Sequence, residues 1–422
     1  MDVFDSIIVG SGAGGATLAK SLTEKGMKTL VLERGKVERV GNIQDCLRFY
    51  DLQGFLKGVR KSKQGVAIWQ SYMAGGSTVI SCGNIARCLE SEIVGFGIDL
   101  SKHFDTCEAE INPMPISEDL LGMRSIRIRN ASHKLGYQMD LMPKGINPIK
   151  CTKCGKCVFG CKYGAKWSSL SELYSAKNNG CSVRYNSTVN RVLHRDGKVT
   201  GVLLECGEVI NSNIVIVSAG GINTPIILQR SGIEEAGRNL FCDLLINVYG
   251  TTDENIDDNE PVMALMNHEF YQSHGIIIAP YIAYNPLYRY NDGGMRTMFK
   301  NPKRTIGMMV KIRDENQGTV HIDGTISKAV SPLDHEKISY GVEICKKILK
   351  EAGAKERFVL SKIQGAHPGG SCAIGKVVNS NLETSIRGLF VSDASILPVS
   401  PGFPPILTIM ALSKYLASHI TK

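Results

Sequence analysis

The chain has 422 residues, of which 43% are apolar and 21% charged, so it can bury a large core and is not wholly disordered. A net charge of +9 comes without a long Lys/Arg block, and aromatic residues are only 7%, so a nucleic-acid groove is not expected. The simplest explanation of the positive charge is a solvated basic surface. The alternative is a surface that attracts an anionic substrate or an acidic electron-transfer protein.

The N-terminus carries acidic residues and lacks the basic start and long apolar stretch of a signal peptide. No run of about 18 uncharged apolar residues occurs, so no membrane span is expected. A cytoplasmic location follows. In that reducing compartment the 13 cysteines favour metal ligands or free thiols over disulfides.

The first elements form a βαβ unit. Residues 4–9 are a short apolar run, typical of a parallel strand that is buried on both faces. A helix that ends at Lys25-Gly26 follows, and residues 28–33 predict a second strand. This order is that of a sheet with helices packed on its faces.

The turn between the first strand and the helix contains the pattern G-x-G-x-x-G at Gly10, Gly12 and Gly15. These glycines allow a tight turn, close approach of a pyrophosphate, and close helix–strand packing. The helix N-terminus then favours the phosphate charge, and Glu33 can accept hydrogen bonds from a ribose. The pattern predicts a dinucleotide site. FAD is favoured over a nicotinamide cofactor because the glycines begin at residue 10 and matching elements recur near the C-terminus.

Four cysteines lie within 11 residues, at Cys151, Cys154, Cys157 and Cys161. Their C-x2-C-x2-C-x3-C spacing is that of ferredoxin cluster loops and predicts an iron–sulfur cluster of the 4Fe-4S type. Zinc is the main alternative, although zinc sites usually pair two separated C-x-x-C knuckles. A redox disulfide is a further alternative.

Cys161 is the predicted fourth ligand of the cluster. In two-cluster ferredoxins the fourth cysteine of such a run serves the other cluster and precedes a proline. Here Lys162 follows Cys161, and there is no second run. A remote thiol therefore stays open as an alternative: Cys82, Cys88, Cys107 or Cys181. Other cysteines, Cys206 and Cys345 among them, are expected to be ordinary buried small residues.

Later segments predict further elements. Residues 182–194 and 198–210 are expected to be strands of the same sheet around the turn Asp196-Gly197, followed by strands at 213–218 and 389–391. A last helix is predicted over 405–418. Between about 240 and 365 the composition changes to alternating strands rich in tyrosine and methionine, with an amphipathic helix near 335–352. This stretch is interpreted as a separate domain inserted into the first.

Several separated segments, in the same order, resemble the glucose–methanol–choline (GMC) oxidoreductases. They are IIVGSGAGGATLA with VLERG, MAGGSTVISCGNIAR (73–87), VSAGGINTPIILQRSGI (217–233), GAHPGGSCAIG (365–375) and GLFVSDASILPVSPGFPPILTIMAL (388–412). The matches bracket nearly the whole chain, with thin coverage over 100–150 and 240–360.

The resemblance implies a bound FAD whose pyrophosphate lies at the glycine turn and whose adenosine ribose meets Glu33. It also implies a loop over the isoalloxazine within 73–90, an adenine contact at Val189, and Asp393 near the ribityl-phosphate portion. Each of these residues has an ordinary alternative role in turns or packing. The implied cofactor-binding residues are Gly10, Gly12, Ala13, Gly14, Gly15, Glu33, Arg34, Gly75, Gly76, Ser77, Asn84, Val189, Ala219, Gly220, Asp393 and Pro404.

Catalysis in this family uses a histidine in an H-x-x-G segment, which matches His367 here. The resemblance implies that His367 takes the proton of a substrate hydroxyl while hydride leaves the same carbon for flavin N5. An imidazole suits this role because its pKa lies near operating pH. The alternative is a buried structural histidine. Where the family has a second His or Asn this chain has Pro404, so the substrate would lose one of two polar partners.

The expected fold class is α/β, or α+β overall. It combines a Rossmann-like FAD-binding domain with an inserted, mainly antiparallel β-sheet substrate domain and an iron–sulfur cluster loop. The FAD-binding domain is predicted to comprise 1–110, 166–239 and 366–422. A connecting segment covers 111–165, with the cluster loop at 151–161, and the substrate domain covers 240–365.

The expected function is that of an FAD- and 4Fe-4S-dependent dehydrogenase of an alcohol or polyol. Its electrons would leave through the cluster to a ferredoxin-like protein carrier. One alternative is a ferredoxin-fed flavin reductase of a carbonyl or alkene. Another is a non-catalytic electron-transfer subunit, and an oligomer or a larger complex is possible. The spectrum of the anaerobic protein reports flavin and cluster together.

Overall fold

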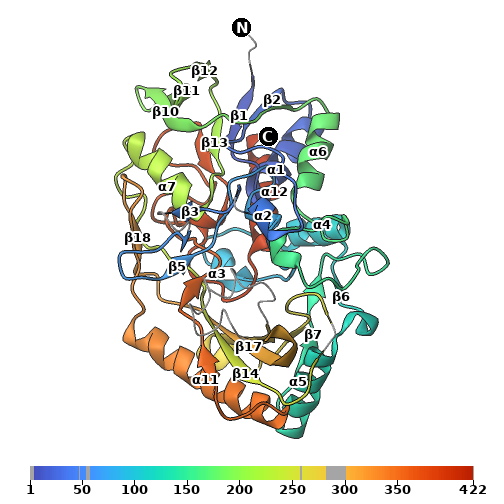
Figure 1. Ribbon diagram of the computed structural model, residues 1–422. Coiled ribbons are helices and arrows are strands. Elements are labelled where there is room, and N and C mark those ends of the chain that lie inside the picture. The colour runs from blue at the N-terminus through green and yellow to red at the C-terminus, as the bar shows by residue number, and fades with distance from the viewer. Residues whose placement is uncertain (1–3, 47, 54–57, 257–258, 282–300, 422) are drawn as a thin grey trace.

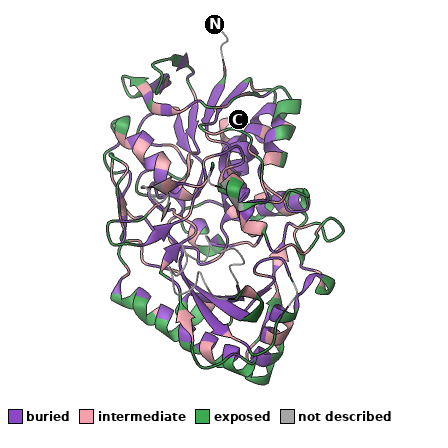
Figure 2. Ribbon diagram, in the orientation of Figure 1, coloured by how far each residue is buried: buried purple, intermediate pink, exposed green. Residues whose placement is uncertain are grey.

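The structure is a computed structural model that describes residues 4–46, 48–53, 58–256, 259–281 and 301–421. It contains two main sheets, one at each end of the molecule (Figure 1). Each sheet has its own apolar core, and Figure 2 shows buried residues concentrated on the strands and on the inner faces of the helices. No helix in the described ranges is long and apolar enough to cross a membrane.

The first sheet is parallel and has the strand order β22-β13-β1-β2-β9. The predicted βαβ unit at the start of the chain is confirmed, because β1 and β2 pair in parallel and α1 connects them. Helix α1 packs between α6 and α12, so the first and last helices of the chain lie side by side. The elements are β1 (Ser6–Val9), α1 (Ala13–Glu24), β2 (Thr29–Leu32), α6 (Leu170–Asn178), β9 (Ser182–Arg184), β13 (Val215–Val217), β22 (Leu389–Val391) and α12 (Ile406–Ile420).

The expectation that residues 182–194 and 198–210 extend this sheet is wrong. Only β9 joins it. The chain then turns at Asn186, which has a φ of +52°, and forms a separate antiparallel sheet. Alternation of apolar and polar residues predicts strands but does not say with which sheet they pair. The separate sheet consists of β10 (Val189–Arg195), β11 (Lys198–Leu204) and β12 (Val209–Asn211).

The second main sheet has the order β16-β17-β14-β21-β5, and β20 also pairs with β14. Its pairs are antiparallel except for β21 with β5, and β5 comes from the N-terminal part of the chain. The strands are β5 (Ala67–Ile68), β14 (Leu244–Thr251), β16 (Ile276–Pro280), β17 (Thr305–Ile312), β20 (Val359–Leu360) and β21 (Gln364–Gly365).

Helix α11 (Pro332–Glu351) covers one face of this sheet. It begins three residues before the predicted start, because Ser331 and Asp334 form a capping box and proline suits the first helical position. Alternate residues of β17, such as Met308 and Val310, join the core beneath α11. The residues that follow each of them, Met309 and Lys311, face a cavity on the other side of the sheet.

The remaining elements connect and flank the two sheets. They are α2 (Ile43–Cys46), β3 (Leu52–Gln53), β4 (Gly58–Val59), η1 (Gly76–Thr78), α3 (Glu90–Val94), α4 (Ser101–Ile111), β6 (Met114–Pro115), η2 (Glu118–Leu120), α5 (Met123–Lys134), β7 (Asp140–Leu141), β8 (Pro143–Lys144), η3 (Cys157–Phe159), α7 (Gly220–Arg230), β15 (Leu265–Met266), α8 (Tyr271–His274), η4 (Pro302–Arg304), β18 (Thr319–Val320), β19 (Ile326–Ser327) and η5 (Ala394–Ile396).

Candidate active site

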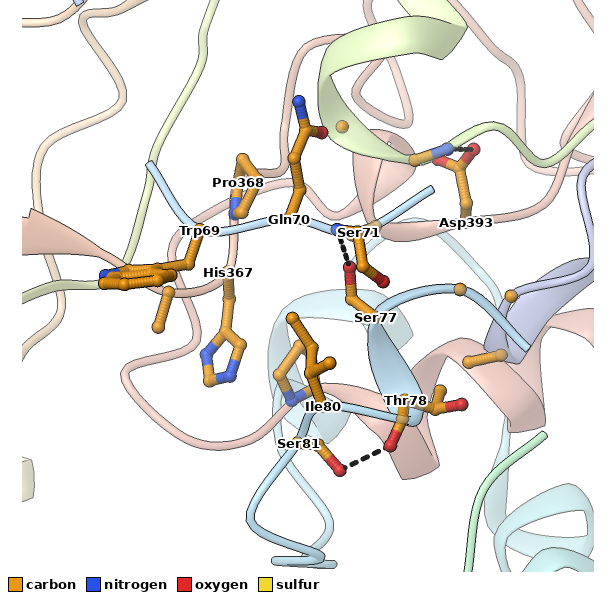
Figure 3. Close-up of a pocket in the computed structure, with 18 of the residues that line it drawn as sticks. Trp69, Gln70, Ser71, Ser77, Thr78, Ile80, Ser81, His367, Pro368 and Asp393 are labelled. Atoms are coloured by element: carbon orange, nitrogen blue, oxygen red, sulfur yellow. Dashed lines mark hydrogen bonds between the residues drawn. The ribbon is translucent and has the colours of Figure 1, made fainter. Parts of the chain in front are cut away.

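A cavity of about 640 Å³ lies between the two main sheets, and both contribute to its walls. The parallel sheet contributes the turns that follow its strands, which is where open α/β sheets bind ligands. Of the cofactor residues expected from the sequence, all but Gly15 and Gly75 line this cavity, and so does His367. Figure 3 shows part of this lining, with Asp393 at one end and Trp69 and His367 at the other.

Each glycine of the first turn is required for its own structural reason. A Cβ atom on Gly10, which has a φ of +100°, would lie 2.4 Å from the Ser218 carbonyl oxygen. On Gly14 it would lie 1.8 Å from the Ser392 carbonyl oxygen, and on Gly15 it would lie 2.0 Å from that of Gly10. A Cβ on Gly12 would meet no protein atom within 4 Å. Gly12 is the N-cap of α1 and borders the cavity, so its small size leaves room for a ligand.

Glu33 holds the glycine turn in place. Its Oε2 accepts hydrogen bonds from the Ser11 backbone N–H and hydroxyl at 3.0 and 2.7 Å, and its Oε1 accepts one from the Gly35 N–H at 2.7 Å. Arg34, the next residue, stacks its guanidinium over the Tyr72 ring at 3.4 Å. Both Glu33 and Arg34 border the cavity, so the carboxylate fixes the turn and also faces the ligand space.

The segment 75–84 lies against the glycine turn. Gly75 and Gly76 have positive φ angles, and a Cβ on Gly76 would lie 3.0 Å from the Gly12 Cα. The Ser77 hydroxyl accepts a hydrogen bond from the Ser71 N–H at 3.2 Å (Figure 3). The Asn84 side-chain oxygen accepts a hydrogen bond from the ammonium of Lys144. The segment therefore covers the cavity beside the turn.

Asp393 connects the last strand of the parallel sheet to α7. Its carboxylate accepts hydrogen bonds from the Gly220 N–H at 2.8 Å, the Thr224 hydroxyl at 2.5 Å and the Ser395 N–H at 2.7 Å. Burial raises the pKa of Asp393, although these donors oppose the effect. Asp393 therefore has a structural role in addition to its position on the cavity wall.

His367 follows β21 and is held at one ring nitrogen. Its Nδ1 lies 2.9 Å from Asp243 Oδ2 and 2.9 Å from Lys311 Nζ. The Lys311 ammonium is itself 3.0 Å from the same carboxylate oxygen. The Asp243 side chain is fully buried and that of Lys311 is 4% exposed, whereas His367 is 29% exposed to the cavity. The imidazole Nε2 has no hydrogen-bond partner among the described residues.

A second buried ion pair lies next to this group. Lys328 Nζ is 2.6 Å from Asp314 Oδ2, and both side chains are at most 1% exposed. The Ser400 hydroxyl lies 2.5 Å from Asp243 Oδ1 and 3.0 Å from Asp314 Oδ1, so it links the two pairs. Buried charges are tolerated when they are paired and hydrogen-bonded in this way.

Burial lowers the pKa of His367, and the Lys311 ammonium lowers it further, against the opposing effect of the Asp243 carboxylate. Burial alone would raise the pKa of Asp243, but Lys311 and His367 leave it below its ordinary value. The imidazole is therefore neutral at neutral pH and the carboxylate is ionised. A neutral imidazole held at Nδ1 can accept a proton at Nε2.

Asp243 and Lys311 were not expected from the sequence. Their positions follow from pairings between distant segments, since β14 and β17 place Leu245 opposite Lys311. One signal was present: a single lysine in the apolar run of β17, TIGMMVKI. Pro404 lines the same cavity and offers no side-chain donor or acceptor.

The four-cysteine loop lies beside the cavity. Its residue Val158 lines the cavity wall, and its carbonyl oxygen accepts a hydrogen bond from the Tyr50 hydroxyl. All four thiols are partly exposed. Burial raises the pKa of Cys151, and the neighbouring thiols of Cys154, Cys157 and Cys161 raise it further. In the described parts of the chain, no group of three or more His, Cys, Asp or Glu side chains is arranged to hold a metal ion.

Two buried lysines donate hydrogen bonds to backbone carbonyl oxygens of the segment 78–84. Lys166 donates to the carbonyl oxygens of Val79 and Ser81 at 2.8 and 2.7 Å, and Lys144 donates to that of Cys82 at 3.1 Å. Burial lowers the pKa of Lys144 to about 8, although the thiols of Cys82 and Cys157 oppose the shift.

The remaining cysteines differ in their surroundings. Cys82 lines the cavity, and burial raises its pKa to about 11. The other alternative fourth ligands, Cys88, Cys107 and Cys181, are buried. Cys345 is buried as expected, but the expectation for Cys206 is wrong, because it is exposed in the turn between β11 and β12.

Two profiles described as GMC oxidoreductase match residues 4–245 and 309–413. The chain is 30% identical to the uncharacterized protein MJ1450 of Methanocaldococcus jannaschii, over 99% of this chain and 100% of that one. It is 27% identical to an uncharacterized GMC-type oxidoreductase, Rv0492c, of Mycobacterium tuberculosis, over 98% and 75% of the two chains. It is 26% identical to the long-chain-alcohol oxidase FAO4A of Arabidopsis thaliana, over 97% and 67%.

Among solved structures, pyridoxine 4-oxidase from Mesorbium loti has a similar fold. The TM-score is 0.76 at 16% sequence identity, and the match covers 99% of each chain.

The lowered pKa of His367 predicts a pH dependence of stability. Between the ordinary pKa of 6.5 and the lower folded value, the unfolded chain binds a proton that the folded protein does not. The free energy of unfolding should therefore fall as pH drops below 6.5, and less so in His367→Gln. Urea unfolding from pH 5 to 8 measures this. His335→Gln, at an exposed helical position, is the control. Equal slopes in wild type and His367→Gln would contradict the shift.

Proposed function

This chain belongs to the GMC oxidoreductase family, and on that premise we propose that it is an FAD- and 4Fe-4S-dependent dehydrogenase of an alcohol or polyol hydroxyl. Its electrons leave through the cluster to an external protein carrier. The observation that carries the proposal is His367, a neutral imidazole with a free Nε2 in the cavity that also contains the glycine turn.

The residues around the cavity fit an FAD. The space beside Gly12, which no protein atom fills, suits a pyrophosphate at the N-terminus of α1. Glu33 would accept hydrogen bonds from a ribose, and the segment 75–84 would cover the flavin ring. When bound, FAD would supply the acceptor for a hydride, which carries both electrons of the alcohol oxidation.

The reaction removes a proton from the alcohol oxygen and a hydride from the adjacent carbon, which leaves a carbonyl. In this chain His367 Nε2 accepts the proton, and Asp243 fixes the imidazole through Nδ1. The Asp243 carboxylate also stabilises the imidazolium that the transfer creates. The fully buried position of Asp243 keeps this interaction away from water.

The cavity wall near His367 favours an alcohol with an apolar body over a polyol. The strands of the second sheet present the apolar side chains of Leu245, Ile277 and Met309 there. The polar side chains that they add to the cavity wall are Asn247, Lys311 and Gln364. Met142, Met263 and Met266 add further flexible apolar surface. The relative named long-chain-alcohol oxidase supports the same substrate class.

The chemistry of the cysteine loop supports a 4Fe-4S cluster held by Cys151, Cys154, Cys157 and Cys161. Four thiols lie within 11 residues and within electrostatic range of one another. Two buried ammonium groups, on Lys144 and Lys166, lie nearby and would offset the negative charge of a thiolate-bound cluster. When present, a cluster supplies a one-electron carrier beside the cavity wall.

The surface of this loop suits an acidic carrier protein. Lys150, Lys156 and Lys162 are exposed around the cysteines, and none of the three forms an ion pair with another described residue. Ile149 beside them is 94% exposed. Positive charge around a redox loop speeds encounter with a negatively charged partner.

The reverse reaction is a second candidate, in which reduced ferredoxin feeds the flavin for reduction of a carbonyl or alkene. The observation in its favour is Pro404, which gives a substrate hydroxyl no side-chain partner.

Gly12→Asp is expected to abolish FAD binding while the protein still folds. The new side chain starts in open space, and aspartate is a favoured N-cap residue, but its charge would repel the pyrophosphate. Absorbance gives the flavin content and circular dichroism the fold. Gly14→Ala is the contrasting variant, because its Cβ would lie 1.8 Å from the Ser392 carbonyl oxygen and should destabilise the fold itself. Normal flavin content in folded Gly12→Asp would contradict the assignment.

The direction of electron flow is tested anaerobically by mixing the holoenzyme with 1-dodecanol, with glycerol or with reduced ferredoxin. Flavin bleaching by dodecanol supports the dehydrogenase, whereas reduction by ferredoxin alone supports the reductase. His367→Ala should retain FAD and iron but slow bleaching by about 10² to 10⁴, the usual contribution of a positioned base. An unchanged rate in His367→Ala would remove this residue from the mechanism.

Anaerobically purified protein is expected to contain about four iron and about four sulfide per chain. Cys154→Ala should lose both, and Cys161→Ala should give a 3Fe form or none. Cys206→Ala, at an exposed thiol remote in sequence from the run, is the control and should keep the full content. Stoichiometric zinc without sulfide would overturn the cluster. A full cluster in Cys161→Ala would move the fourth ligand to another thiol.

A further inference from the structure

We propose that Asp243 and Lys311 act as a pair of positioning residues that keep His367 neutral, with its proton on Nδ1 and its Nε2 free. The inference rests on the proposed function and extends it. It assigns roles to two residues remote in sequence from the histidine.

The contact geometry carries the proposal. Asp243 Oδ2, Lys311 Nζ and His367 Nδ1 form a triangle with sides of 2.9, 2.9 and 3.0 Å. A carboxylate oxygen only accepts hydrogen bonds, so the contact with Asp243 requires a proton on Nδ1. The Lys311 ammonium, which only donates, then directs its hydrogen bond to the Asp243 carboxylate and lies beside Nδ1 as a positive charge. The proton-free nitrogen is then Nε2, which has no hydrogen-bond partner in the described part of the chain.

The lysine has a separate task from the carboxylate. An unopposed buried carboxylate would draw a second proton onto the imidazole and so remove the base. Lys311 lies in contact with both groups and offsets that charge. Lys311 extends from β17, and its cross-strand neighbours Leu245 and Ile277 are apolar and cannot pair with its charge. The contacts with Asp243 and His367 therefore explain why a buried charge is tolerated at this position.

No other described group near Asp243, Lys311 and His367 supplies the positive charge that offsets the Asp243 carboxylate. Burial raises the pKa of the Cys88 thiol to about 12 and that of Cys82 to about 11, so both are neutral. The second cation, Lys328, pairs with Asp314 at 2.6 Å and donates to the Glu315 carbonyl oxygen at 2.6 Å. Lys328 is not part of the cavity wall, which makes it a matched control.

The decisive measurement is ¹⁵N NMR of the His367 ring in the holoenzyme, because the shifts of Nδ1 and Nε2 report the tautomer and the pKa without any turnover. Wild type should show the Nδ1–H tautomer. Lys311→Met should raise the pKa of His367, because Asp243 is then unopposed. Asp243→Asn should lower that pKa and loosen the tautomer preference. Lys328→Met removes an equally buried ammonium that does not contact the imidazole, so it should shift the pKa of His367 less than Lys311→Met does.

Anaerobic flavin reduction by 1-dodecanol across pH provides the second readout. In Lys311→Met the acidic limb of the curve of flavin-reduction rate against pH should move to higher pH, because the pKa of the base is raised. In Asp243→Asn the plateau should fall by about 10² to 10⁴, the range lost when a base is misplaced. The double variant Asp243→Asn/Lys311→Met is charge-balanced and leaves no unpaired buried charge. Its His367 should lose the preference for the Nδ1–H tautomer, but the pKa of His367 should not rise as it does in Lys311→Met.

The proposal would be overturned if the tautomer and the pKa of His367 in Lys311→Met and Asp243→Asn were the same as in the Lys328→Met control. If dodecanol, glycerol and other alcohols fail to reduce wild type, the proposed function fails, but the NMR comparison still decides the role of the pair.

Discussion

The site depends on a balanced group of four buried charges, in which Asp243 pairs with Lys311 and Asp314 pairs with Lys328. The Ser400 hydroxyl touches both carboxylates, and the Gly402 N–H donates to Asp243 at 3.0 Å. Because an unpaired buried charge is costly, these contacts fix the start of β14 and the end of β17 against the C-terminal segment. That segment continues to Pro404, which lines the same cavity as His367.

Close backbone contacts bring the two sheets together at the same place. A Cβ on Gly221 would lie 2.1 Å from the Pro368 carbonyl oxygen, and one on Gly369 would lie 2.6 Å from that of Ala394. The segment after His367 thus passes between α7 and η5 with no room for side chains. The glycine pairs at 220–221 and 369–370 serve this packing as well as access to a ligand, and any shift here would move the imidazole.

The features predicted well from the sequence are local ones. The glycine turn and the first βαβ unit are each encoded within about thirty residues, where spacing alone determines the geometry. Asp243 and Lys311 are 124 and 56 residues from His367, and only the pairing of β14 with β17 brings them together. The misassigned strands at 189–204 have the same cause, because an alternating pattern predicts a strand but leaves its partner undefined. A lysine in a buried apolar strand is the one sequence signal that pointed toward the missed pair.

The cysteine loop and the imidazole lie at different places on the cavity wall and differ in their surroundings. Val158 of that loop borders the cavity, and Lys166 donates to carbonyl oxygens of the segment 75–84, which lines the same cavity. A hydride acceptor needs a dry cavity, whereas a one-electron carrier must reach a partner at the surface. Under the proposed function, the partly exposed cysteine loop would meet the second requirement, and the cavity with its fully buried Asp243 would meet the first.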